Sequence, residues 1–97
     1  MILYGLKTCD TCRKALKSLP DAGFRDVRAD GVPHDVLKSA YTRYGTELIN
    51  TRSATWRALD KAERTRDPLE LLTEHPVLMK RPLIEAGGTL YLGWSRE

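Results

Sequence analysis

The chain has 97 residues, of which 41% are hydrophobic and 30% are charged, and its formal net charge is +3. This length predicts one domain over residues 1–97 with a hydrophobic core, and the composition argues against disorder. No apolar run approaches the roughly 20 residues of a membrane helix, and the start lacks the pattern of a secretory signal. We therefore expect a cytoplasmic protein with reduced thiols. Basic and acidic residues alternate along the chain, which predicts a solvated surface without direct membrane or nucleic-acid binding.

The first predicted element is a short buried strand over Ile2 to Gly5, which leads into a loop that holds both cysteines at a Cys-x-x-Cys spacing. A helix from about Asp10 to Leu19 follows. Cys9 lies at the start of this helix, where unpaired N–H groups and the helix dipole favour a thiolate. Cys12 lies one turn later, on the predicted buried face. We predict that Cys9 is an exposed nucleophile and that Cys12 is its resolving partner.

Two other interpretations of the cysteine pair remain open. A Cys-x-x-Cys pair can form half of a zinc site, but the chain has no further cysteine. His34 and His75 also lie too far along the chain for the usual ligand spacing, so we expect no bound metal. The second alternative is a Cys12 that only fills the core as a small hydrophobic residue.

The middle of the chain is predicted to be mostly helical. The alternation from Phe24 to Ala29 predicts a second strand. An apolar stripe at helical spacing predicts a helix that begins at Pro33 and ends at Gly45. A short helix is expected over Ala54 to Leu59, and the alternating charges of Lys61 to Arg66 predict an exposed connection.

The last part of the chain predicts one helix and two strands. Asp67-Pro68-Leu69-Glu70 has the N-cap and capping-box pattern of a helix start, and Pro76 would end that helix. Strands over 81–86 and 89–94 are separated by Gly87-Gly88, a hairpin signal. The fold class is therefore α/β: a β-α-β unit with parallel strands, a helical insertion, and a C-terminal hairpin that completes a mixed four-stranded sheet.

Three motifs, in this order and at this spacing, resemble the arsenate reductase (ArsC) family of thioredoxin-like proteins, which includes the Spx regulators and the YffB-type proteins. Together they cover nearly the whole chain. They are Tyr4-Gly5-Leu6-Lys7-Thr8-Cys9-Asp10-Thr11-Cys12-Arg13-Lys14-Ala15, Leu48-Ile49-Asn50-Thr51-Arg52-Ser53-Ala54-Thr55-Trp56-Arg57 and His75-Pro76-Val77-Leu78-Met79-Lys80-Arg81-Pro82-Leu83-Ile84.

The resemblance implies a thioredoxin-like fold and a set of site residues. Cys9 matches the cysteine that attacks arsenate in enzymes of the family. Arg52 and Arg81 match two arginines that hold the oxyanion, a role that suits a planar and permanently charged guanidinium. A surface ion pair is the alternative for either arginine. Pro82 matches the proline that faces the thiol, so we expect a cis Arg81-Pro82 bond.

One position departs from the arsenate reductases, which carry a further arginine after the C-terminal glycine. Here Gly93 is followed by Trp94, and Arg96 lies close by. The main hypothesis is an ArsC-like thiol–disulfide oxidoreductase acting on a small oxyanion, thiol or disulfide. It would have no tightly bound cofactor and would be reduced by glutathione, glutaredoxin or thioredoxin. The alternative is an Spx-like redox-sensing regulator that binds RNA polymerase. In either case we expect a monomer.

Overall fold

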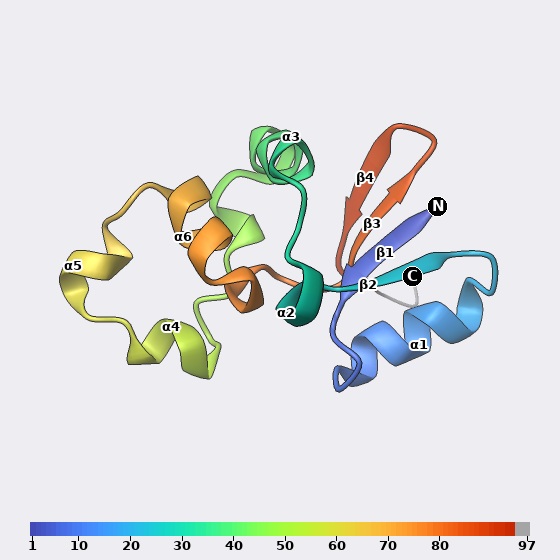
Figure 1. The fold of residues 1–97 in the computed structure, drawn as a ribbon, viewed down its shortest axis with the longest axis horizontal. Coiled ribbons are helices and arrows are strands. Elements are labelled where there is room, and N and C mark those ends of the chain that lie inside the picture. Colours follow the sequence, from blue (N-terminus) through green and yellow to red (C-terminus); the bar gives the residue numbers. More distant parts are fainter. Residues whose placement is uncertain (95–97) are drawn as a thin grey trace. The chain divides into compact units, whose positions relative to one another are not determined.

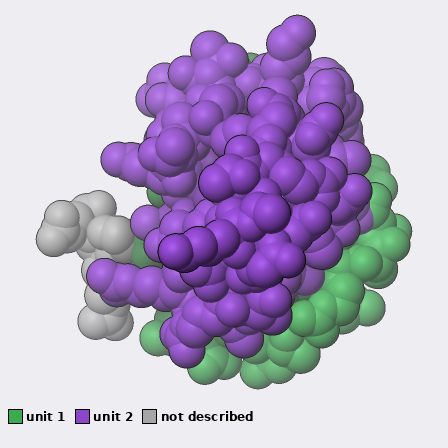
Figure 2. Space-filling model, turned by 90° about the vertical axis from the view of Figure 1, so that its left-hand side faces the viewer, with its two compact units in different colours: residues 1–30, 81–97 green, residues 31–80 purple. Residues whose placement is uncertain are grey.

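The structure is a computed structural model that describes residues 1–94. The chain forms two compact units, drawn in different colours in Figure 2. Unit 1 contains Met1–Asp30 and the chain from Arg81 onward, and unit 2 contains Gly31–Lys80. The expectation of one domain over residues 1–97 stays a prediction.

Unit 1 is built on a four-stranded mixed sheet in the order β2-β1-β3-β4 (Figure 1). Strand β1 (Ile2–Gly5) pairs in parallel with β2 (Gly23–Asp26), and helix α1 (Asp10–Ser18) connects the two. Strand β3 (Leu83–Ala86) runs antiparallel to β1 and forms a hairpin with β4 (Thr89–Leu92). The predicted α/β fold class, with its β-α-β unit and terminal hairpin, is confirmed.

Helix α1 is fixed to the sheet by a small apolar cluster. Leu3 from β1, Cys12 and Ala15 from α1 and Ile84 from β3 are buried together. Partly buried residues pack around them: Cys9, Leu16, Leu19, Phe24 and Trp94. Because both cysteines belong to this packing, the core of unit 1 also positions the candidate site.

The second strand is shorter than predicted. Strand β2 ends at Asp26, and Val27–Asp30 form the short helix α2, so the expected strand through Ala29 is wrong. The Asp26 carboxylate accepts hydrogen bonds from the N–H groups of Arg28, at 2.9 Å, and Ala29, at 3.2 Å. A side chain that caps these donors favours a helical turn over an extended chain.

The hairpin has the predicted Gly87-Gly88 turn, with φ angles of 56° and 80° that glycine adopts without steric cost. The Arg81-Pro82 bond is cis, as expected. Strand β4 ends at Leu92, earlier than predicted, because Gly93 turns the chain with a φ of 84°. The N–H of Gly93 donates to the carbonyl of Pro82 at 2.8 Å, which ties the segment before Trp94 to the start of the hairpin.

Unit 2 begins with helix α3 (His34–Tyr44), which matches the predicted helix within one residue at each end. Val36, Leu37 and Ala40 of the apolar stripe are buried as expected, whereas its other members are only half-buried: Val32, Tyr41 and Tyr44. The 3₁₀ helix η1 (Gly45–Leu48) follows, and Gly45 has a φ of 59°.

Four short helical segments complete unit 2. They are α4 (Ala54–Ala58), α5 (Lys61–Arg64), α6 (Pro68–Glu74) and the 3₁₀ helix η2 (Pro76–Leu78). Helix α5 corrects the predicted exposed connection: the Asp60 side chain accepts from Glu63 N–H at 2.8 Å and so caps a turn. Asp67 caps α6 as predicted. Among the described residues, no helix is both long and apolar enough to cross a membrane.

Candidate active site

The candidate site begins where strand β1 ends and helix α1 starts. Cys9 is the N-cap residue of α1 and has an extended backbone conformation. Its N–H donates to the carbonyl of Leu6 at 3.1 Å, and its own carbonyl accepts from Arg13 N–H at 3.0 Å. The thiol therefore lies at the positive end of the helix, as the sequence predicts.

Two side chains hold the loop before Cys9 in place. Arg13 donates from Nε to the carbonyl of Lys7 at 2.8 Å, and the Asp26 carboxylate lies 3.4 Å from the N–H of Lys7. Sequence reasoning missed both roles. The capping pattern of Asp26 offered a signal, but the alternation of Phe24 to Ala29 favoured a strand.

The Cys9 thiol is partly exposed and its pKa is lowered. Its partial burial acts to raise this pKa, because the low-dielectric surroundings disfavour the charge. Hydrogen bonds from the backbone and thiol of Cys12, together with the hydrogen bond and charge of Arg81, outweigh that effect. The site therefore favours the thiolate form of Cys9, which is the nucleophilic form.

The Cys12 thiol has the opposite environment. It is fully buried, and this burial raises its pKa to about 11 although a backbone hydrogen bond from Leu6 acts in the other direction. A Cβ added at Gly5 would overlap the Cys12 Sγ, so strand β1 needs a glycine where this thiol packs. Both cysteines are free thiols in this structure, and Cys12 is confirmed on the buried face of α1.

Arg81 is the third group of the thiol site. It is partly exposed, its Nε atom is buried, and its side chain hydrogen-bonds to Cys9. The adjacent Pro82 is fully buried at the start of the hairpin. The structure thus brings Cys9, Cys12 and Arg81 together, which sequence spacing alone did not indicate.

Arg52 belongs to unit 2 and lies exposed in a turn before α4. Its N–H donates to the Asn50 side chain at 3.1 Å, and Arg57 donates to its carbonyl at 2.7 Å. Ser53 Oγ also donates to the carbonyl of Asn50, at 2.9 Å. The backbone that carries Arg52 is therefore well fixed. Arg96, the other basic residue considered, lies outside the described residues.

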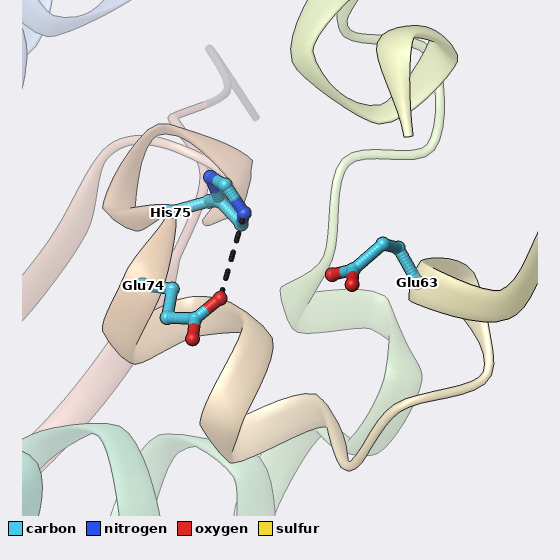
Figure 3. Close-up of side chains that lie close together, drawn as sticks. All are labelled: Glu63, Glu74 and His75. Carbon is cyan, nitrogen blue, oxygen red and sulfur yellow. Dashed lines mark ion pairs between the residues drawn. The ribbon is translucent and has the colours of Figure 1, made fainter. Parts of the chain in front are cut away.

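A separate group in unit 2 offers metal-ligand atoms: Glu63, Glu74 and His75 (Figure 3). One potential ligand atom from each lies within 4.8 Å of the others. Arg66, however, donates to Glu63 at 2.8 Å and to Glu74 at 2.6 Å. A guanidinium already neutralises these carboxylates, so the group is better explained as an ion-pair cluster than as a metal site.

Comparison with known proteins identifies the family. The model of the ArsC family matches residues 4–97. The chain belongs to the ArsC family. The Cys9 loop, Arg52 and Arg81 all lie within the matched segment.

Individual relatives match along nearly the whole chain. An uncharacterised protein of Haemophilus influenzae is 38% identical over 104 residues, which cover 98% of this chain and 91% of the relative. Global transcriptional regulator Spx 2 of Bacillus anthracis is 30% identical over a gapped alignment of 107 residues, which covers 100% of this chain and 82% of the regulator. The solved structure of the YFFB protein matches with a TM-score of 0.86 and 31% identity, covering 97% of this chain and 90% of that one. These matches confirm the ArsC-type thioredoxin-like fold.

Proposed function

We propose that this ArsC-family protein is a cytoplasmic thiol–disulfide oxidoreductase in which Cys9 is the nucleophile. The observation that carries the proposal is the contrast between two thiols in one helical turn. Cys9 is accessible and has a lowered pKa, whereas Cys12 is buried and has a raised pKa. This is the arrangement that a nucleophile and a protected resolving thiol need.

In the first step, the Cys9 thiolate attacks one sulfur of a substrate disulfide. A bond forms between Cys9 Sγ and that sulfur, the substrate S–S bond breaks, and the other substrate half leaves as a thiolate. Arg81 stabilises the thiolate before attack through its hydrogen bond and its charge. With arsenate as substrate, the Cys9 thiolate attacks arsenic, an As–S bond forms, and one arsenate oxygen leaves as water after protonation by solvent. Attack of Cys12 on Cys9 Sγ then breaks the As–S bond, and arsenic leaves with that electron pair as arsenite.

In the second step, Cys12 loses its proton to the leaving thiolate and attacks Cys9 Sγ. The mixed disulfide breaks, a Cys9–Cys12 disulfide forms, and the second substrate half leaves as a thiolate, which takes its proton from water. Two protein thiols thus supply the two electrons that reduce the substrate. Glutathione, glutaredoxin or thioredoxin would return those electrons, and no tightly bound cofactor takes part.

Arg52 is proposed to bind the negative charge of the substrate. Its guanidinium is always charged and suits carboxylates and oxyanions alike. The hydrogen bonds that fix the turn around it would reduce the conformational entropy lost on binding.

The alternative function is redox-sensing transcriptional regulation by an Spx-like protein. The 30% identity with Spx 2 along the full length of this chain favours it. By resemblance, the partner would then be RNA polymerase, and the Cys9–Cys12 pair would act as a switch rather than turn over.

Coupled turnover would separate the two functions. NADPH consumption is followed with glutathione plus glutaredoxin, or with thioredoxin, while arsenate and a small mixed disulfide are offered in parallel. We expect turnover with wild type and none with Cys9→Ser. In Cys12→Ser, the mixed disulfide on Cys9 should accumulate, visible as added mass on the intact protein.

Absence of turnover with every donor, while Cys9 and Cys12 still form a reversible disulfide, would reject the enzyme proposal. Co-purification of the chain with RNA polymerase subunits, lost on oxidation of the pair, would then support the regulator.

A further inference from the structure

One segment of unit 2 carries an excess of positive charge. Residues 50–66 contain five basic and two acidic residues, a net +3, which equals the formal charge of the whole chain. Arg52 has a place in the proposed reaction, and Arg66 lies in the ion-pair cluster. Arg57, Lys61 and Arg64 have no assigned role, and all three are exposed. We call these three residues the basic surface.

Contacts within the segment hold the basic surface together. Arg64 donates from Nη2 to the carbonyl of Arg57 at 3.2 Å and from Nε to the carbonyl of Trp56 at 3.3 Å. Lys61 and Arg64 are three residues apart in α5, so their side chains are neighbours on the helix. The three positive charges therefore gather around α4 and α5.

The basic surface differs from Arg66 in its partners. Arg66 is surrounded by Glu63 at 2.8 Å, Glu74 at 2.6 Å and Glu70 at 3.9 Å. Within residues 1–94, none of the ion pairs involves the basic surface. Arg57 and Arg64 use part of their guanidinium donors on backbone carbonyls and keep others available for a ligand. Neighbouring like charges that form no ion pairs suit binding of an anionic partner.

Trp56 indicates which class of anionic partner fits. The guanidinium of Arg64 lies over its indole ring, 5.6 Å from the ring centre. Single-stranded nucleic acids bind by stacking bases on free aromatic faces. Because Arg64 covers a face of Trp56, this segment is better suited to carboxylates. We propose that the basic surface docks an acidic segment of a partner protein.

This inference goes beyond the proposed function, because docking uses neither Cys9 nor Cys12. It can therefore be tested with the full chain and a peptide probe, without any redox reaction. The probe is a synthetic peptide of alternating Glu and Ser, and its control is the same peptide with Gln in place of Glu. Binding is followed at low ionic strength by amide chemical shifts of the isotope-labelled protein.

Lys61→Gln and Lys38→Gln form a matched pair of variants. Each removes one positive charge from an exposed lysine on a helix of unit 2, but only Lys61 lies in the basic surface. We expect Lys61→Gln to weaken binding of the Glu peptide about threefold to fivefold, as for one exposed charge pair. Lys38→Gln should change it less than about twofold. Cys9 alkylation should be unchanged in both variants.

The proposal predicts that the Glu peptide changes the amide chemical shifts mainly of residues 57–64. The Gln peptide should cause no such changes. Equal losses from the two lysine variants would overturn it. No binding, or shifts located elsewhere, would overturn it as well. Tighter binding of a DNA oligonucleotide than of the Glu peptide at the same salt concentration would replace it with nucleic-acid binding.

Discussion

The thiol site has an exposed side, which holds Cys9 and Arg81 and which we call its mouth, and a buried side, where Cys12 packs on Gly5 and which we call its floor. The two sides shift the pKa of a cysteine in opposite directions. At the mouth, Cys9 is partly exposed and Arg81 helps to lower its pKa. At the floor, Cys12 is buried against Gly5, and its pKa is raised to about 11. A Cys-x-x-Cys spacing alone assigns neither property. Burial and hydrogen-bond donors, rather than the motif, therefore decide which thiol is activated.

The largest effect is expected from removing the nucleophile at the mouth. Cys9→Ser should lower coupled turnover by at least about 100-fold, because a hydroxyl is not ionised at neutral pH. Cys12→Ser should also stop multiple turnover but retain a single attack by Cys9. A stopped-flow measurement of the first thiolate released distinguishes the two. A Cys9→Ser variant that still releases the first substrate thiolate at the wild-type rate would show that Cys9 is not the nucleophile.

The packing around Cys12 can be disturbed without substituting either cysteine. In Gly5→Ala the new Cβ would overlap Cys12 Sγ, so strand β1 or helix α1 must shift. We expect the free energy of unfolding to fall by about 1–3 kcal/mol, a typical cost of overpacking, measured by denaturant titration.

Gly23→Ala is the matched control for this prediction. It lies in the neighbouring strand, and its added Cβ would meet only the carbonyl oxygen of Met1, at an ordinary 3.7 Å. Adding Cys12→Ala to Gly5→Ala should recover part of the lost stability, because the overlapping sulfur is gone. Equal effects of the two glycine variants would show that Cys12 does not pack on Gly5.

At the mouth, Arg81→Ala should raise the pKa of Cys9, because it removes a hydrogen bond and a positive charge that favour the thiolate. Alkylation of Cys9 near neutral pH should slow by about tenfold, the effect of one charge-assisted hydrogen bond that water partly screens. Arg28→Ala, at an exposed arginine of the same unit, should leave the rate unchanged. A rate unaffected by Arg81→Ala would remove this arginine from the site.

The smallest effect is expected from removing the hydrogen bond between the Cys12 thiol and Cys9. Cys12→Ala removes the thiol that hydrogen-bonds to Cys9 but keeps the backbone N–H of residue 12. The pKa of Cys9 should rise less than in Arg81→Ala, with alkylation about twofold to threefold slower, since S–H is a weak donor. The same alkylation assay measures this change. A larger loss than in Arg81→Ala would reverse the order of the two contributions.

Much of the fold could be predicted from the sequence because local chemistry and tertiary packing agree there. Gly87-Gly88 can turn a hairpin by itself, and Asp67 followed by proline begins a helix wherever it packs. Prediction failed where a side-chain cap overrode the pattern. Asp26 ends β2 early, and Asp60 turns a charged connection into α5.

The candidate site was less accessible to sequence reasoning than the fold. The position of Cys9 at a helix start follows from local signals. The contact between Cys9 and Arg81 joins residues far apart in sequence, so only family resemblance indicated it. The close approach of Gly5 and Cys12 depends on how α1 packs on β1, which no local pattern encodes.

The most direct test of whether Cys9 is the activated thiol is the pH dependence of alkylation at each cysteine, resolved by mass spectrometry of the digested protein. Only the thiolate reacts, so each rate rises with pH and levels off above the pKa of that thiol. For Cys9 we predict a midpoint below the free-cysteine value of ~8.5, with native Cys12 unmodified over the same pH range. A Cys9 midpoint at or above the free value, or faster modification of Cys12, would show that Cys9 is not the activated thiol.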